Sequence, residues 1–211
     1  MTASLEIVRA LELAGERAGF VATGQTGVFI ADRGVVVDAV VADFVAGEVE
    51  ALVLEAAAEA DIVMVEGQGA LHHPAYSGVT LALLHGACPV GLVLCHQAGR
   101  DHIRVGRRAD PGGLEAEASW PIPPLADLVT AYETAAGWLR PAPVIAVALN
   151  TLGLEEDAAR AACERAARAT GLAVSDPVRF GAAPLAAAVI AAAGARRGLE
   201  PGGRRSRATS A

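Results

Sequence analysis

The segment "DIVMVEGQGALHHPAYSGVT", residues 61–80, decides the fold of this chain. A short apolar run from Ile62 to Val65 ends in a carboxylate, Glu66, and is followed by Gly-Gln-Gly and many polar side chains. Such a run, bounded by an acid and by glycines, is typical of a buried strand in a parallel sheet. Ligands of these sheets bind beyond the carboxyl ends of the strands. The segment therefore predicts a strand that delivers Glu66 to a binding site.

Strand and helix patterns alternate along the rest of the chain. Strands are predicted at 20–23, 61–66, 88–96 and 142–150, and a last short strand and turn within 172–181. Helices are predicted at 3–18, 38–60, 79–86, 124–139, 154–171 and 182–197. The polar segment 97–123 is predicted to be a loop and a candidate lid. This alternation predicts an α/β fold with a mostly parallel sheet and helices on both faces. Polar residues fall at four predicted strand ends: Thr23, Glu66, His96 and Asn150.

Composition and charge narrow the class of protein. The 211 residues suffice for one α/β domain, which we expect at 1–195, followed by a disordered basic tail at 196–211. The net charge is −7, and the five arginines and one glutamate of the tail leave −11 for residues 1–195. Nucleic acid is therefore not an expected partner. No apolar run is long enough for a membrane span and no signal peptide is evident, so we expect a cytoplasmic protein.

All seventeen basic residues are arginine. The absence of lysine excludes a Schiff-base mechanism and a phosphate-loop lysine within these residues. The three cysteines form no C-x-x-C pair, so neither a disulfide scaffold nor a zinc site is predicted.

Glu66 is the strongest candidate for chemistry. It suits a metal ligand or a general base, or it caps the next helix as a strand-end carboxylate. Gly67 and Gly69 let the backbone approach a ligand closely. His73 is a second candidate base, although the adjacent His72 and His73 make a poor chelating pair because neighbouring side chains point in different directions.

Two turns supply candidate binding groups. The loop "TGQTG" contains two glycines, two hydroxyls and an amide after a strand, and its N–H groups can cradle a carboxylate or phosphate. Ser77 is predicted to cap the following helix or to bind an anion there. The candidate substrate-binding residues of the two turns are Thr23, Gly24, Gln25, Thr26, Tyr76 and Ser77.

Two further residues, Asn150 and Arg179, keep two interpretations each, and two acids are weighed beside them. Asn150 is a candidate to hydrogen-bond an adenine or a substrate amide, or to stabilise a turn. Arg179 clamps a carboxylate or pairs with Asp176. Asp38 is explained by the dipole of a helix start, whereas Asp43 has no such explanation and is a candidate metal ligand.

Several blocks together resemble the C-terminal domain of the DUF1611 family: "FVATGQTG", "VDAVVADFVAGEVE", "VEGQGALHHPAYSGVTLALLHG", "ALNTLGL" and "SDPVRFG". The resemblance runs from residue 1 to about 193. Members of that family include D-glutamate N-acetyltransferases that use acetyl-CoA, and the fold is similar to P-loop enzymes of the dethiobiotin-synthetase kind. The resemblance implies that Gln68 lines the substrate pocket, and that Thr2 and Asn150 contact the cofactor.

One departure from the family pattern concerns the start of the chain. The pattern has a strand and a G-x-x-x-x-G-K loop before a helix that begins Met-Thr, whereas this chain opens "MTASLEIVRAL". We therefore expect the first strand and the phosphate loop to be missing. A groove should then expose Val63 and Val65 beside the Glu66 strand. The open sheet should also favour a homo-oligomer and leave the isolated chain nearly inactive.

Three functions follow as hypotheses. The first is acetyl-CoA-dependent N-acetylation of a small D-amino acid such as D-glutamate, with Glu66 or His73 as base and Arg179 as the cation for a substrate carboxylate. The second is an ATP- and magnesium-dependent ligase or kinase, with Glu66 and Asp43 near the metal. The third is an inactive, truncated homologue.

Overall fold

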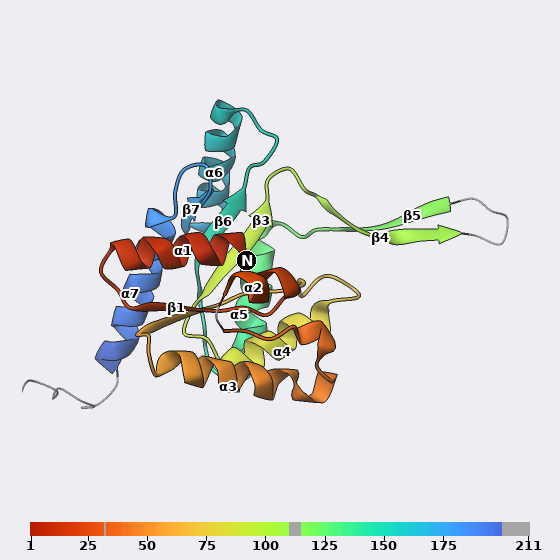
Figure 1. Cartoon of the computed structure of the whole chain (residues 1–211). Helices are drawn as coiled ribbons and strands as arrows, with labels where there is room; N and C mark the ends of the chain where they lie inside the picture. The colour runs from red at the N-terminus through yellow and green to blue at the C-terminus, as the bar shows by residue number, and fades with distance from the viewer. Residues whose placement is uncertain (32, 110–114, 200–211) are drawn as a thin grey trace, which may run out of the picture.

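The computed structural model describes residues 1–31, 33–109 and 115–199 (Figure 1). Its core contains two parallel sheets. β1 (Ala18–Val21) pairs with β2 (Ile62–Val65) in the first, and the second has the order β3-β6-β7. The strands of the second sheet are β3 (Leu92–Gln97), β6 (Val144–Asn150) and β7 (Ala173–Ser175). The predicted α/β class with parallel strands is confirmed.

Helices α1 (Thr2–Leu13) and α7 (Ala183–Leu199) pack on one face of both sheets. Ile7, Leu11 and Leu185 are at most 1% exposed and form a cluster with residues of β2 and β6. Burial of three such side chains contributes several kcal/mol, at about 1.5–3 kcal/mol for each one.

Helices α3 (Val45–Ala57) and α4 (Ser77–Ala87) cover the opposite face. Met64 packs with the α1–α7 cluster and Val65 with the α3–α4 cluster, as the alternation of side chains along a strand requires. α4 ends one residue beyond Gly86, which was predicted to end it. A Cβ at Gly86 would collide with the Ala46 carbonyl. The role of this glycine is to let α3 and α4 approach closely.

Two further helices complete the layers. α5 (Leu125–Gly137) buries Leu128 against Leu94 and Val147, and α6 (Glu156–Thr170) buries Ala162 beside Leu149. Both helices were predicted within two residues at each end because their apolar periodicity is strong.

The segment 38–60 differs from the predicted continuous helix. Two single turns, η1 (Val37–Ala39) and η2 (Ala42–Phe44), precede α3. β-Branched valines disfavour a helix, and the preceding chain lies beside the end of β1, where the N–H groups of Val35 and Val37 donate to Ala22 and Thr23. A short helix, α2 (Gln25–Ile30), follows β1.

The prediction that 97–123 is a loop was wrong. β4 (His102–Ala109) and β5 (Glu115–Pro121) form an antiparallel hairpin that projects from the body (Figure 1). Ile103, 5% exposed, anchors its base. A lid role for this segment stays a prediction.

The ends of the described chain bear on two expectations. α7 extends to Leu199, four residues beyond the expected domain end at 195. Residues 200–211, predicted as a disordered tail, lie outside the described residues. None of the helices within the described ranges is both long enough and apolar enough to cross a membrane.

A groove separates the two sheets. It has a volume of about 500 Å³ and is lined by β2, β3 and helices from both faces. Val63 and Val65 both line it and are partly exposed. The predicted groove beside the Glu66 strand is therefore confirmed.

Candidate functional site

Glu66 follows directly after β2 and is only 6% exposed. Its Oε2 accepts hydrogen bonds from the backbone N–H groups of Thr23, at 2.9 Å, and Gly24, at 3.2 Å. Its Oε1 lies 3.4 Å from the α-ammonium of Met1. One carboxylate oxygen thus holds the turn after β1, and the other faces the start of α1.

The turn after β1 is shaped around this carboxylate. Thr23 is fully buried, and its Oγ1 donates to the Glu66 carbonyl at 3.0 Å. Gly27 is required in α2, because a Cβ there would lie 2.5 Å from Glu66 Oε2. The structure therefore brings together Glu66, Thr23 and Gly24, as the sequence predicted for neighbouring strand ends.

Gln68 connects the loop after β2 to the same turn. Its side-chain amide donates to the Thr23 carbonyl and to Thr23 Oγ1, the latter at 3.2 Å, while its own backbone carbonyl accepts from Thr80 Oγ1 at 2.9 Å. Gly69 has φ +66°, and a Cβ there would lie 2.7 Å from the Tyr76 carbonyl oxygen. These contacts fix the geometry of the loop around Glu66.

His73 and Tyr76 lie further along this loop. Their ring centroids are 4.5 Å apart, and His73 Nδ1 accepts a hydrogen bond from the Ala75 N–H at 3.1 Å. Tyr76 is 55% exposed, so its hydroxyl is accessible to a ligand. The prediction that Ser77 caps α4 was wrong: Tyr76 holds the N-cap position, Ser77 is the first helical residue, and no side chain caps this end. The sequence gives no signal that separates these two neighbouring positions.

Gln25, Thr26 and Thr2 are exposed residues of first helical turns, the first two in α2 and Thr2 in α1. The contact between Met1 and Glu66 places the start of α1 at the carboxyl edge of the first sheet. These three side chains are accessible to a ligand, and their binding roles stay predictions.

Asn150 and Arg179 lie after β6 and β7. Asn150 is paired with Gln97 in the register of β3 and β6, and its Oδ1 accepts from the Leu152 N–H at 2.8 Å. This contact is the turn role that its alternative interpretation predicted. Arg179 donates from Nη1 to the Leu154 carbonyl at 2.7 Å, so the guanidinium does not form the predicted ion pair with Asp176.

Asp176 instead organises a buried network. Its Oδ2 accepts from the Thr151 N–H and Oγ1, at 2.8 and 2.6 Å, and its Oδ1 accepts from the N–H groups of Val178 and Arg179, both at 3.0 Å. Burial opposes ionisation of this carboxyl group, but these donors outweigh it and hold its pKa below the ordinary 3.8. Sequence reasoning missed the network because Thr151 and Asp176 are twenty-five positions apart.

Sequence reasoning also missed a basic cluster at the end of β3. Burial lowers the pKa of His96, and the nearby positive charges of His72 and Arg100 lower it further. Burial likewise lowers the pKa of His72, whose Nδ1 has no hydrogen-bond partner among the described residues. The sequence places His96 at a strand end, and this was the only signal for the cluster. That His72 lies near His96 depends on the tertiary packing of the loop after β2 against the end of β3.

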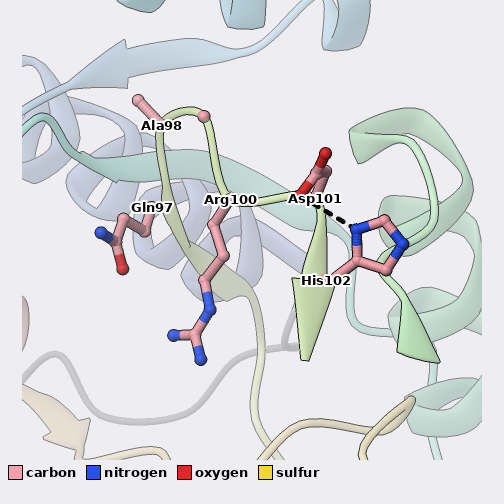
Figure 2. Close-up of a pocket in the computed structure, with 6 residues that line it drawn as sticks. Gln97, Ala98, Arg100, Asp101 and His102 are labelled. Carbon is pink, nitrogen blue, oxygen red and sulfur yellow. Dashed lines mark ion pairs between the residues drawn. The ribbon is translucent and has the colours of Figure 1, made fainter. Parts of the chain in front are cut away.

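Figure 2 shows the turn that follows β3. It borders an open cavity of about 540 Å³, and the Arg100 side chain extends away from the Asp101–His102 pair. His102 Nδ1 lies 3.0 Å from Asp101 Oδ1, and this hydrogen bond lowers the pKa of Asp101. Arg100 is thus an accessible cation at the carboxyl edge of the second sheet.

Asp43, the second candidate metal ligand, lies in η2. Within 1–31, 33–109 and 115–199, no three His, Cys, Asp or Glu side chains are grouped so that they could hold a metal ion. A metal held by Asp43 and Glu66 alone, with a substrate completing its coordination, stays a prediction.

Parallel strands with helices on both faces, and polar residues at the ends of the strands, define an α/β domain whose ligands are expected at the carboxyl ends of the strands. Residues 1–186 match the family described as "Domain of unknown function (DUF1611_C) P-loop domain", and the chain belongs to this family. Two curated relatives are D-glutamate N-acetyltransferases. The one from Pseudoalteromonas sp is 35% identical over 86% of this chain and 51% of the relative. The one from Tritonibacter scottomollicae is 36% identical over 90% and 54%.

A solved structure supports the same assignment. The crystal structure of a DUF1611 family protein from Anabaena variabilis is 41% identical, with a TM-score of 0.79, and covers 90% of this chain and 53% of that one. The chain spans about half the length of the curated relatives it matches.

Proposed function

We propose that this chain acts in the acetyl-CoA-dependent N-acetylation of a D-amino acid such as D-glutamate, with Glu66 as the general base. The observation that carries the proposal is the geometry of Glu66. Oε2 is held by two backbone N–H groups, and the residue is only 6% exposed. A fixed, buried carboxylate at the end of a strand is suited to receive a proton from an acceptor amine.

Acetyl transfer at the carboxyl edge of the sheet requires two proton transfers and the exchange of a C–S bond for a C–N bond. The acceptor ammonium loses one proton to Glu66, and its nitrogen attacks the thioester carbonyl carbon. The C–N bond forms, the C–S bond breaks, and the second proton from nitrogen leaves with the CoA thiol. Tyr76 is the proposed donor to the developing oxyanion, since the N–H groups of Thr23 and Gly24 are already engaged by Glu66.

The anionic groups of the substrates need cations. Arg179 is the proposed partner of a substrate carboxylate and Arg100 of the co-substrate phosphates, because both side chains are exposed at the carboxyl edge. Thr2 and Asn150 are proposed cofactor contacts, and His73 is the alternative base. The functional assignment also rests on the two related D-glutamate N-acetyltransferases.

The test is a chimera in which residues 1–186 replace the matched region of the Tritonibacter relative. We expect N-acetyl-D-glutamate and free CoA thiol to form without ATP, as followed by mass spectrometry and a thiol assay. The 211-residue chain by itself should be at least about 10³-fold slower, because half of the relatives' length is not represented in it. A folded chimera that makes no product would contradict the acetyltransferase proposal, and strict ATP dependence would favour the ligase or kinase.

A further inference from the structure

Two histidines from different sheets lie near each other at the carboxyl edge. His96 is the second-to-last residue of β3 and pairs with Leu149 of β6, and His72 lies in the loop between β2 and α4. The charge of His72 acts on His96, so the two imidazoles are close in space although they are far apart in the sequence. Neither histidine has a part in the acetyl transfer as described so far.

The loop that carries His72 is held by α5. The N–H of Leu71 donates to the Tyr132 hydroxyl at 3.2 Å, and both side chains pack in the same apolar cluster. Beside this anchor, His72 Nδ1 is buried and has no hydrogen-bond partner among the described residues. Burying a polar nitrogen without a partner costs free energy. Nε2 is the ring nitrogen of His72 that is left for a compensating interaction with a ligand.

The charged groups that act on the two imidazoles in the described part of the chain are cationic. For His72, burial is the largest cause of a lowered pKa, and the charge of His73 adds to it. For His96, burial is again the largest cause, and the charges of His72 and Arg100 add to it. Tyr132 is uncharged near neutral pH, because burial raises the pKa of its hydroxyl. Cationic groups that gather without a carboxylate among them suit an anionic ligand.

The nearest carboxylate along the chain from His96 belongs to Asp101, and it is already engaged. Its Oδ1 lies 3.0 Å from His102 Nδ1. Figure 2 shows Gln97 and Arg100 on one side of the turn after β3 and the Asp101–His102 pair on the other. The open cavity of about 540 Å³ that borders this turn gives a small ligand access to the end of β3.

We propose that His72 and His96 bind the second carboxylate of a dicarboxylic amino acid and thereby select an acidic acceptor. This inference rests on the proposed function, which assigns the acceptor ammonium to Glu66 and one carboxylate to Arg179 but leaves the other carboxylate without a partner. Imidazole N–H groups donate hydrogen bonds to a carboxylate, and they do so more strongly when the ring is protonated. The loop that begins at Glu66 also carries His72, so the base and the specificity site are held by one segment.

Carboxylate binding at these histidines should be coupled to proton uptake. Without a ligand, both imidazoles have a pKa below the ordinary 6.5 and are mostly neutral near pH 7. A bound carboxylate favours the charged rings and raises both pKa values. The preference for an acidic acceptor over one with an uncharged side chain should therefore increase as pH falls from about 7.5 to about 5.5.

The first experiment measures binding to the 211-residue chain by NMR of the imidazole C–H groups, with signals assigned from His72→Gln and His96→Gln. D-Glutamate is compared with D-glutamine, which keeps the ammonium and one carboxylate but has an amide in place of the second. We expect D-glutamate to raise the pKa of both histidines and D-glutamine to leave them unchanged. The signal of His102, which is paired with Asp101, should not respond to either ligand.

The second experiment measures selectivity in the chimera with the Tritonibacter relative. We expect His72→Gln and His96→Gln each to reduce the ratio of kcat/KM for D-glutamate to that for D-glutamine by about 10-fold or more, with the loss in the KM for D-glutamate. The remaining preference should depend less on pH. His102→Gln, in the neighbouring turn, is the matched control and should keep the ratio and its pH dependence.

Three results would overturn the inference. The first is that the signals of His72 and His96 do not respond to D-glutamate, or respond equally to D-glutamine. The second is a response to inorganic phosphate alone, which would assign the histidines to a phosphate group. The third is an active chimera whose selectivity neither substitution changes. A chimera that forms no acetylated product would instead contradict the proposed function, and the NMR titration would still decide whether the two histidines bind a carboxylate.

Discussion

Thr23 and Glu66 are joined by two hydrogen bonds, from Thr23 N–H to Glu66 Oε2 at 2.9 Å and from Thr23 Oγ1 to the Glu66 carbonyl at 3.0 Å. Both residues are buried and forty-three positions apart. The pair fixes the orientation of the carboxylate relative to the edge of the sheet. Changes to Glu66, to its partners and to the separate Asp176 network should therefore have distinguishable effects.

Replacing Glu66 with glutamine retains the shape of the side chain and an oxygen acceptor for the Thr23 and Gly24 N–H groups, but it removes the base. We expect Glu66→Gln to lower acetyl transfer by the chimera by about 10²-fold or more. Circular dichroism should show an unchanged fold. Unchanged turnover would leave Glu66 with a structural role.

Replacing Thr23 with valine tests the second hydrogen bond. Thr23→Val removes the hydroxyl that donates to Glu66 and accepts from Gln68, and leaves a buried carbonyl with one donor fewer. We expect a loss of about 1–3 kcal/mol in the free energy of unfolding, measured by urea titration. Thr26→Val, at an exposed position of α2, is the matched control and should change stability by less than about 0.5 kcal/mol.

Replacing Gly27 with alanine tests the close approach of α2 to the carboxylate. The new Cβ would lie 2.5 Å from Glu66 Oε2, so either the helix or the carboxylate must move. We expect Gly27→Ala to cost about 1–3 kcal/mol by thermal or urea unfolding. Gly47→Ala in α3 meets nothing within 4 Å and should be neutral or stabilise by up to about 1 kcal/mol. Equal effects of the two substitutions would mean that the approach of α2 to Glu66 does not limit the packing at Gly27.

The Asp176 network should make stability depend on pH. The folded-state pKa of Asp176 is lowered from 3.8, so its ionised form stabilises the folded state fully above that value, and this contribution is lost as pH falls through the folded pKa. Asp176→Asn should therefore cost about 2–4 kcal/mol near pH 6. The difference from the unsubstituted protein should shrink below about pH 4, as urea titrations across pH would show. The exposed Asp38→Asn is the control, and a pH-independent difference for Asp176→Asn would contradict the assignment.

Local sequence predicted the parts of the fold whose signal is periodic. The strand at 61–66 and the helices α5 and α6 were found from their patterns because their buried faces repeat along the chain itself. The hairpin β4–β5 was missed because its pairing joins residues as far apart as His102 and Pro121, and the polar composition of the segment resembles a loop. The turns η1 and η2 were missed because Val35 and Val37 donate hydrogen bonds to the chain at the end of β1, which overrides the apparent helix pattern before α3.

The features of the candidate site also fall into those that local sequence shows and those that depend on tertiary packing. The sequence by itself determined that Glu66 ends a buried strand, that a Gly-rich turn follows β1, and that no lysine is available in these residues. Tertiary structure decided that Thr23 and Gly24 donate to Glu66, that Arg179 turns to Leu154, and that Asp176 binds Thr151. Chemical type is a property of each residue, but a hydrogen-bond partner depends on which strand ends meet, and only the packing of the sheets and helices decides that.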